Sequence, residues 1–110
     1  MSPFAKTPKP PYYAVIFTSK RTEGDKGYEK LAEEMAMLAA NQPGFLGAES
    51  VRNAEGFGVT VSYWDSLDAI RNWKANDAHL IAQEKGKTVY YDNYVTRICK
   101  VEREYSLREL

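Results

Sequence analysis

Cysteine and histidine are almost absent from this sequence, which has one of each among 110 residues. A single cysteine, Cys99, excludes an internal disulfide and any zinc site that is built from several thiolates. Because Cys99 stands within an apolar alternation, we expect its thiol to be buried and unreactive. Any chemistry that needs an imidazole depends on His79.

An excess of charge of either sign is also missing, since 15 lysines and arginines balance 15 aspartates and glutamates. Binding to nucleic acid or to an anionic membrane surface needs a surplus of positive charge, so we expect neither partner. There is no apolar run long enough for a signal peptide or a membrane span, and the expected location is the cytoplasm. Phosphate loops, nucleotide fingerprints, carboxylate metal clusters and serine-nucleophile elbows are absent as motifs.

The length predicts one domain, and a hydrophobic fraction of 44% is enough for an ordinary interior. Prolines at positions 3, 8, 10 and 11 predict a flexible N-terminal tail over residues 1–11, because proline fixes φ and lacks a donor. The folded domain is expected over residues 12–106, and residues 107–110 form a C-terminal tail.

Hydrophobic spacing predicts alternating strands and helices. A β-branched and aromatic run marks the first strand, and apolar residues at intervals of three and four mark helices. The second helix is interrupted at residues 75–77 and ended by Gly86. The expected strands are 12–20, 45–53, 57–64 and 94–105, and the expected helices are 27–40 and the interrupted segment from 67 to 86, followed by a helical turn at 88–92. This β-α-β-β-α-β order predicts an α+β, ferredoxin-like antiparallel sheet with its helices on one face.

The first strand is apolar on both sides, which is expected of a strand that is covered on both faces. One side carries Tyr13, Val15 and Phe17, and the other carries Tyr12, Ala14 and Ile16. Since the helices cover only one face of the sheet, the other would be bare in a monomer. Packing two such faces together would bury both, so we expect a homodimer.

Two segments resemble a known family. Residues 61–79 read Val-Ser-Tyr-Trp-Asp-Ser-Leu-Asp-Ala-Ile-Arg-Asn-Trp-Lys-Ala-Asn-Asp-Ala-His, and residues 42–47 read Gln-Pro-Gly-Phe-Leu-Gly. Together they resemble the antibiotic biosynthesis monooxygenase family. The resemblance implies a dimeric α/β barrel with a pocket between the sheet and the helices of each subunit. Some members oxidise polycyclic phenols, anthrones or quinols with oxygen and no cofactor, some degrade haem, and others have no assigned activity.

His79 is the candidate catalytic residue, as a general base toward a phenolic or otherwise acidic substrate. The alternative is that it caps or packs the second helical segment. Trp73 lies on the inward side of its helix and is either core or a flat wall for a planar ligand. Phe17, Tyr63 and Tyr94 are the other candidate substrate-binding residues, because they supply aromatic surface from the sheet.

Arg97 interrupts an otherwise apolar strand face, and a buried guanidinium needs a partner. Glu49 on the second strand is the candidate partner, and we expect a structural ion pair at the barrel or dimer interface, while binding an anion in the pocket is the alternative role.

The predicted function is a cofactor-independent monooxygenase acting on a small aromatic, quinol or anthrone-like molecule, with neither metal nor cofactor. The alternatives are a non-catalytic dimer that binds a small ligand and a haem-degrading relative. Two features disagree with haem degradation. Gln83 stands near the position of the haem-ligating histidine of those relatives, and the first strand lacks the asparagine that they carry there.

Overall fold

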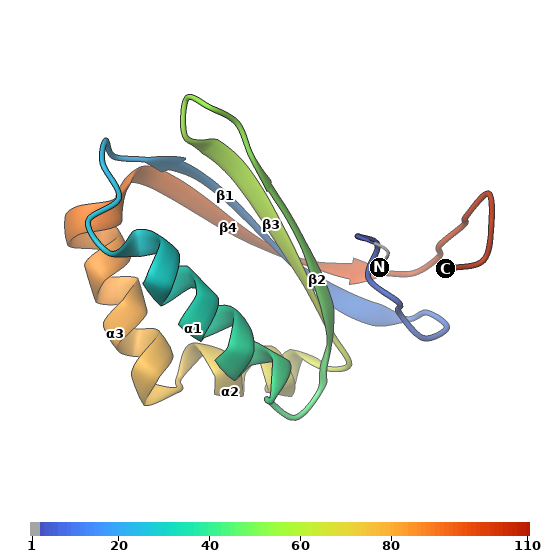
Figure 1. The fold of residues 1–110 in the computed structure, drawn as a ribbon. Helices are drawn as coiled ribbons and strands as arrows, with labels where there is room; N and C mark the ends of the chain where they lie inside the picture. Colours follow the sequence, from blue (N-terminus) through green and yellow to red (C-terminus); the bar gives the residue numbers. More distant parts are fainter. Residues whose placement is uncertain (1–2) are drawn as a thin grey trace.

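Helices cover one side of a four-stranded antiparallel sheet in the computed structural model, which describes residues 3–110 (Figure 1). The sheet order is β2-β3-β1-β4, with strands β1 (Tyr12–Arg21), β2 (Phe45–Arg52), β3 (Phe57–Trp64) and β4 (Tyr91–Val101). The helices are α1 (Tyr28–Ala40), α2 (Leu67–Lys74) and α3 (Asp77–Lys85), and a π-helical turn, Gly86–Tyr90, follows α3. This is the predicted ferredoxin-like arrangement, with the second helix divided in two.

The last strand differs most from its predicted bounds. It begins at Tyr91 rather than at residue 94, and it ends at Val101 rather than at residue 105. Val101 pairs with Tyr12, the first residue of β1. Pro11 precedes Tyr12 and has no N–H to donate, so the ladder has no partner beyond this point.

The side chains of β1 point alternately to the two faces of the sheet. Tyr13 and Val15 pack against Trp64, which is fully buried, and against Ala69 and Ile70 of α2. We call this side the helix-facing side, and the other side, which carries Tyr12, Ala14, Ile16 and Thr18 of β1, the open face. The main hydrophobic cluster therefore lies between the sheet and α2, while Tyr12 and Ala14 are buried on the open face.

The break between α2 and α3 has a local cause. The side chain of Ser66 caps α2 by accepting from the Ala69 N–H at 3.0 Å. Two residues after α2 ends, the Asn76 side chain accepts from the N–H groups of Ala78 and His79 at 3.0 and 3.3 Å. An asparagine in extended conformation is a preferred start for a new helix, so the chain turns here instead of continuing.

Cys99 is exposed rather than buried, which corrects our expectation. It belongs to β4, an edge strand, and pairs with Ala14 on the open face, where no helix covers it. Within residues 3–110, no helix has both the length and the apolar character that crossing a membrane requires.

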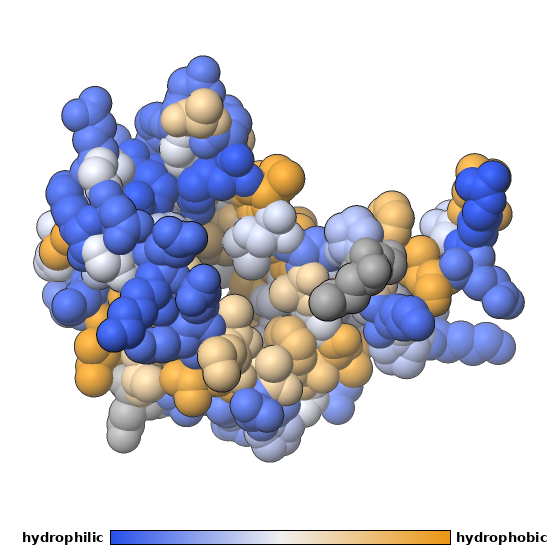
Figure 2. Space-filling view, viewed as in Figure 1, coloured by the Kyte–Doolittle hydropathy of each residue, from blue (hydrophilic) through white to orange (hydrophobic). Residues whose placement is uncertain are grey.

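Figure 2 shows hydrophobic side chains on the lower part of one face, over the C-terminal half of α1. Met37 and Leu38 are exposed there.

Candidate functional site

His79 and Trp73 form a stacked pair where α2 turns into α3. Their ring centroids are 4.2 Å apart and their planes differ by 12°. Trp73 in turn stacks on Trp64 of β3, with centroids 6.4 Å apart. The imidazole is therefore attached to the hydrophobic core through two tryptophans. Trp73 is both core and aromatic surface, so the two roles considered for it are compatible.

The protonation of His79 follows from its hydrogen bond. Its Nδ1 lies 3.0 Å from the main-chain oxygen of Trp73. A carbonyl oxygen only accepts, so Nδ1 carries the hydrogen and Nε2 of the neutral ring keeps its lone pair. Burial lowers the pKa of His79, and the bond to the carbonyl opposes this without reversing it. The ring is thus a neutral base at physiological pH.

A second aromatic group surrounds Phe17 on the same side of the sheet. Its ring centroid lies 5.3 Å from that of Tyr91 and 5.1 Å from that of Tyr94. Phe17 is two residues beyond Val15, and side chains two apart on a strand share a face. Since Val15 packs against the core that includes Trp73, both aromatic groups lie along the helix-facing side of β1.

Two arginines extend this second group, and sequence reasoning missed them. The guanidinium carbon of Arg21 lies 3.8 Å above the centre of the Tyr28 ring. Arg52 donates to the Ser19 hydroxyl at 2.8 Å, and Tyr91 donates to the Tyr28 hydroxyl at 3.1 Å. Burial raises the pKa of Tyr91, so its phenol stays protonated. Both arginines stand at strand ends, where no periodic pattern distinguishes them from ordinary surface charges.

The helices do not seal this side of the sheet. None of the residues of α1 is buried. Ser50 and Thr96 lie in the same register row as Phe17, at the two edges of the helix-facing side, and both are exposed. Solvent therefore reaches both edges of the helix-facing side.

Tyr63 and Arg97 lie on the open face, away from the other four candidates. Tyr63 pairs with Ala14 and Arg97 pairs with Ile16. The structure thus brings His79 together with Trp73, and Phe17 together with Tyr94. It does not bring either pair together with Tyr63 or Arg97.

The expected ion pair between Arg97 and Glu49 is not formed within the chain. Arg97 is exposed on β4 and Glu49 lies on β2, at the opposite edge of the sheet. Three strand spacings separate the edges, which is about 14 Å. Glu49 instead accepts from the Tyr63 hydroxyl at 2.6 Å and from the Ala5 N–H at 3.1 Å.

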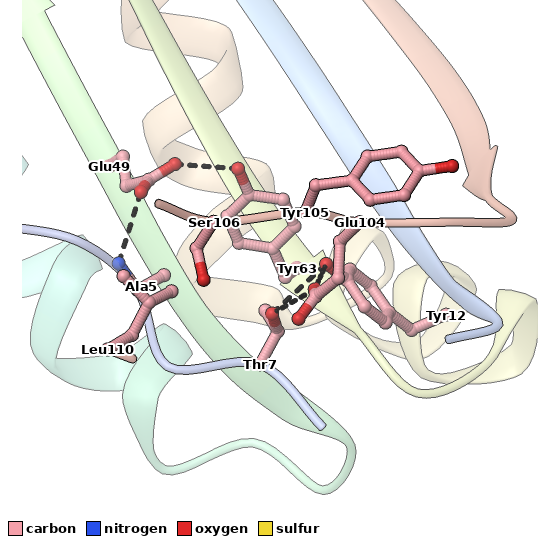
Figure 3. A pocket seen from close by; sticks show the side chains of 9 residues that line it. All are labelled: Ala5, Thr7, Tyr12, Glu49, Tyr63, Glu104, Tyr105, Ser106 and Leu110. Atoms are coloured by element: carbon pink, nitrogen blue, oxygen red, sulfur yellow. Dashed lines mark hydrogen bonds between the residues drawn. The ribbon is translucent and has the colours of Figure 1, made fainter. Parts of the chain in front are cut away.

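A pocket of about 140 Å³ lies on this side, under the two chain ends (Figure 3). Glu49 and Tyr63 line one part of it, and Glu104 and Tyr12 line another. Tyr12 donates to Glu104, and Thr7 donates to the same carboxylate at 2.7 Å. Burial raises the pKa of Tyr63 and of Tyr12, while the hydroxyls of Tyr12 and Thr7 lower the pKa of Glu104. None of the described residues that line this pocket is a lysine or an arginine.

The fold defines the class of protein: an α+β, ferredoxin-like domain with a four-stranded antiparallel sheet. The sequence pattern of the antibiotic biosynthesis monooxygenase family matches residues 11–85. The chain belongs to this family. Among the described residues, no three or more histidines, cysteines, aspartates or glutamates are grouped to hold a metal ion.

Among proteins of known sequence, the chain is similar to YqjZ of Bacillus subtilis, an uncharacterized protein. The two are 56% identical over 105 residues, and the match covers 96% of this chain and 92% of YqjZ. Among solved structures it is similar to SnoaB, a cofactor-independent oxygenase from Streptomyces nogalater, with a TM-score of 0.75 and 16% identity over 88% of this chain and 98% of SnoaB. Rv0793 of Mycobacterium tuberculosis is similar with a TM-score of 0.71 and 13% identity, over 88% of this chain and 100% of Rv0793. The two structural likenesses show the fold.

Proposed function

We propose that the protein is a cofactor-independent monooxygenase that oxidises a small aromatic, quinol or anthrone-like substrate, with His79 as its base. The observation that carries the proposal is the 3.0 Å contact between Nδ1 of His79 and the main-chain oxygen of Trp73. Donation from Nδ1 to the Trp73 carbonyl leaves a lone pair on Nε2, and the lowered pKa keeps it free at neutral pH. Family membership and the likeness to SnoaB support the same reaction class.

Cofactor-free oxygenation needs little from the protein beyond a base and a surface that excludes water. His79 removes a proton from an acidic carbon or phenol of the substrate, and the electron-rich anion passes one electron to oxygen. The substrate radical and superoxide combine to a peroxide anion on the same carbon. Loss of the second proton from that carbon forms the carbonyl as the O–O bond breaks, and this proton together with the one held by His79 leaves with the departing oxygen as water. An anthrone methylene and one O₂ thus become a carbonyl and one water, so the substrate supplies all the electrons.

The aromatic side chains have a positioning role in this proposal. Trp73 on one side and Phe17 with Tyr94 on the other supply flat surfaces for a planar ring system. Trp73 is held by its stack on buried Trp64, so its orientation is set by the core. A ligand that stacks on Trp73 would lie beside the His79 ring.

The direct test is oxygen uptake by the purified protein with a panel of anthrones and reduced quinones. We expect uptake above the spontaneous rate, and a loss of about a hundredfold or more in His79→Ala, which is the usual contribution of a general base. Leu80→Ala, at the exposed neighbouring position, is the matched control and should keep the full rate. Full activity in His79→Ala would exclude His79 as the base. Substrate binding without uptake would identify a ligand-binding protein instead.

We also propose that the protein acts as a homodimer through its open face. The support is apolar surface that nothing covers: Val51, Phe57 and Val95 are 74%, 51% and 42% exposed on that face. A contiguous apolar sheet face is stabilised when a second sheet packs on it. Light scattering should give twice the 12.5 kDa mass of one chain. A monomer at micromolar concentration would contradict this proposal.

A further inference from the structure

The open face carries opposite charges at its two edges. We propose that Arg97 of each subunit pairs with Glu49 of the partner subunit, and that these two pairs set the alignment of the two sheets. This inference rests on the homodimer proposed above, and it adds which residues meet and in which orientation.

Four residues form one row across the open face. Arg97 pairs with Ile16, Ile16 pairs with Val61, and Val61 pairs with Glu49. The row therefore reads from a cation on β4, through two apolar side chains, to an anion on β2. The next row reads Val95, Thr18, Val59 and Val51, with no charge.

Neither Arg97 nor Glu49 has an ion-pair partner among residues 3–110. Arg97 has no ion pair or hydrogen bond to any of the residues 3–110, and its side chain is exposed. Glu49 lines a pocket that also contains Glu104 and has no basic residue in its wall. Tyr63 and Ala5 orient the Glu49 carboxylate by donating to it, one to each oxygen. A carboxylate has about four acceptor positions, so it can still receive a guanidinium.

Two-fold symmetry makes this row complementary to itself. A dimer interface of this kind uses the same patch on both subunits, so if residue i contacts j, then j contacts i. Suppose that the two-fold axis runs between the two packed sheets, parallel to the strands and level with the boundary between β1 and β3. Arg97 then faces Glu49 of the partner subunit. Ile16 then faces Val61 of the partner subunit, and Val95 faces Val51 of the partner subunit. Thr18 faces Val59 of the partner subunit, so the two rows bring together two ion pairs and apolar contacts without opposing like charges.

Charge disfavours the other simple arrangement when its axis passes through the charged row. In it the two-fold axis runs parallel to the plane of the sheet but perpendicular to the strands. Each edge strand of one subunit then faces the same edge strand of the other subunit. If the axis passes through the charged row, Arg97 faces Arg97 and Glu49 faces Glu49 of the second copy. Opposed like charges at an interface are strongly unfavourable. The two charged residues therefore select between orientations that the apolar rows alone would permit.

The test uses two single variants, Arg97→Glu and Glu49→Arg, purified separately. In each homodimer both pairs become like-charged, so we expect dimerisation to weaken by about tenfold or more. When the two variants are mixed, a heterodimer restores both pairs, since each chain carries the charge that the other needs. Native mass spectrometry of the mixture, with one variant isotope-labelled, should show heterodimers well above random exchange.

Lys100→Glu is the matched control, because Lys100 is exposed on the same strand but on the helix-facing side, paired with Tyr13. It makes the same charge change and should leave dimerisation unaltered. Circular dichroism checks that each variant is folded. If Glu49→Arg does not fold, Glu49→Gln and Arg97→Gln are combined instead, and their effects on dimerisation should be non-additive.

The outcomes separate this inference from the proposed dimer. Preferential heterodimers, or a non-additive double variant, support the pairing. If the wild-type protein is a dimer but the mixed variants exchange subunits at random, the pairing is wrong and the proposed dimer stands. The same holds if the effects of the two variants on dimerisation are additive. A monomeric wild-type protein overturns both, and the oxygenase proposal is then tested by oxygen uptake alone.

Discussion

Trp73 holds the His79 imidazole through both its side chain and its main chain. The two rings are stacked with centroids 4.2 Å apart, and the carbonyl oxygen of Trp73 lies 3.0 Å from Nδ1 of His79. The stack fixes the plane of the imidazole, and the hydrogen bond fixes its rotation within that plane. The direction of the Nε2 lone pair is therefore set by one residue, which is itself packed against the core.

The first prediction concerns the pKa of His79. Burial lowers it below the ordinary value of 6.5, so its neutral form should predominate at neutral pH. If the neutral ring is the base, the rate should rise with pH through this lowered pKa and be constant above it. Because His79 is the only histidine, its ring protons can be titrated by NMR without overlap.

Trp73→Leu gives this prediction a contrast. Removing the stacked indole admits water to the imidazole, so the pKa of His79 should rise toward 6.5. Leu67→Ala, an exposed change on the same helix, should leave the pKa where it is. A wild-type titration midpoint above 6.5 would contradict burial as the dominant influence on this ring.

The same group predicts how stability depends on pH. Since the pKa of His79 is lower in the folded than in the unfolded chain, the unfolded chain binds the proton more readily. The stability that neutral His79 contributes is complete above 6.5 and is lost as pH falls toward the folded-state pKa. Urea unfolding of wild type and of His79→Gln should therefore differ in pH dependence between about pH 8 and about pH 5. Parallel curves would show that the imidazole is not desolvated.

Strand and helix periodicity was sufficient to predict the fold. The alternation in residues 12–20 identified both faces of β1, and the interruption at residues 75–77 predicted the break between α2 and α3. The contact between Trp73 and His79 could not be predicted in this way. Residues six apart do not share a helix face. Their stacking depends on the angle that the capped turn at Asn76 imposes.

The division of the candidates between two faces has a different cause. Tyr63 was considered as aromatic surface beside Phe17 and Tyr94, and Arg97 as the partner of Glu49 or of an anion, but pairing with Ala14 and Ile16 places both on the open face. Alternation tells which residues share a side of one strand, and only the register relates one strand to the next. Arg97 and Glu49 do share a face, yet the strand order places them at opposite edges. Sequence spacing contains no information on that order.

Arg52 should be a main contributor to the stability of the β2–β3 hairpin. It donates to the Gly56 carbonyl at 2.6 Å and to the hydroxyl of Ser19 at 2.8 Å, and Ser19 is only 2% exposed. Arg52→Ala leaves the buried Ser19 hydroxyl without this donor, while the Gly56 carbonyl keeps its bond from the Arg21 N–H at 2.9 Å, so we expect a loss of about 2 kcal/mol in the free energy of unfolding. Urea denaturation measures it.

Arg52→Lys separates geometry from charge. Lysine keeps the positive charge but cannot present two nitrogens in a planar fork to Gly56 and Ser19. We expect it to recover less than half of the loss. Complete recovery would mean that the charge, rather than the two hydrogen bonds, stabilises the hairpin.

A final prediction compares two glycines that have the same backbone conformation but different surroundings. Gly44 and Gly24 both adopt positive φ, at +86° and +78°. An added Cβ at Gly44 would lie 2.4 Å from a carboxylate oxygen of Asp65 and 2.6 Å from the Cβ of Ala69, whereas at Gly24 its nearest neighbour would be 3.8 Å away.

Gly24→Ala should cost at most about 1 kcal/mol in the free energy of unfolding, because the strain of a left-handed alanine is partly offset by a less flexible unfolded chain. Gly44→Ala adds overpacking against α2 and should cost about 3 kcal/mol. Thermal and urea unfolding of the two variants measure the difference. Equal losses would show that the turn before β2 moves to admit the methyl group, and that α2 is not held as closely against it as these distances require.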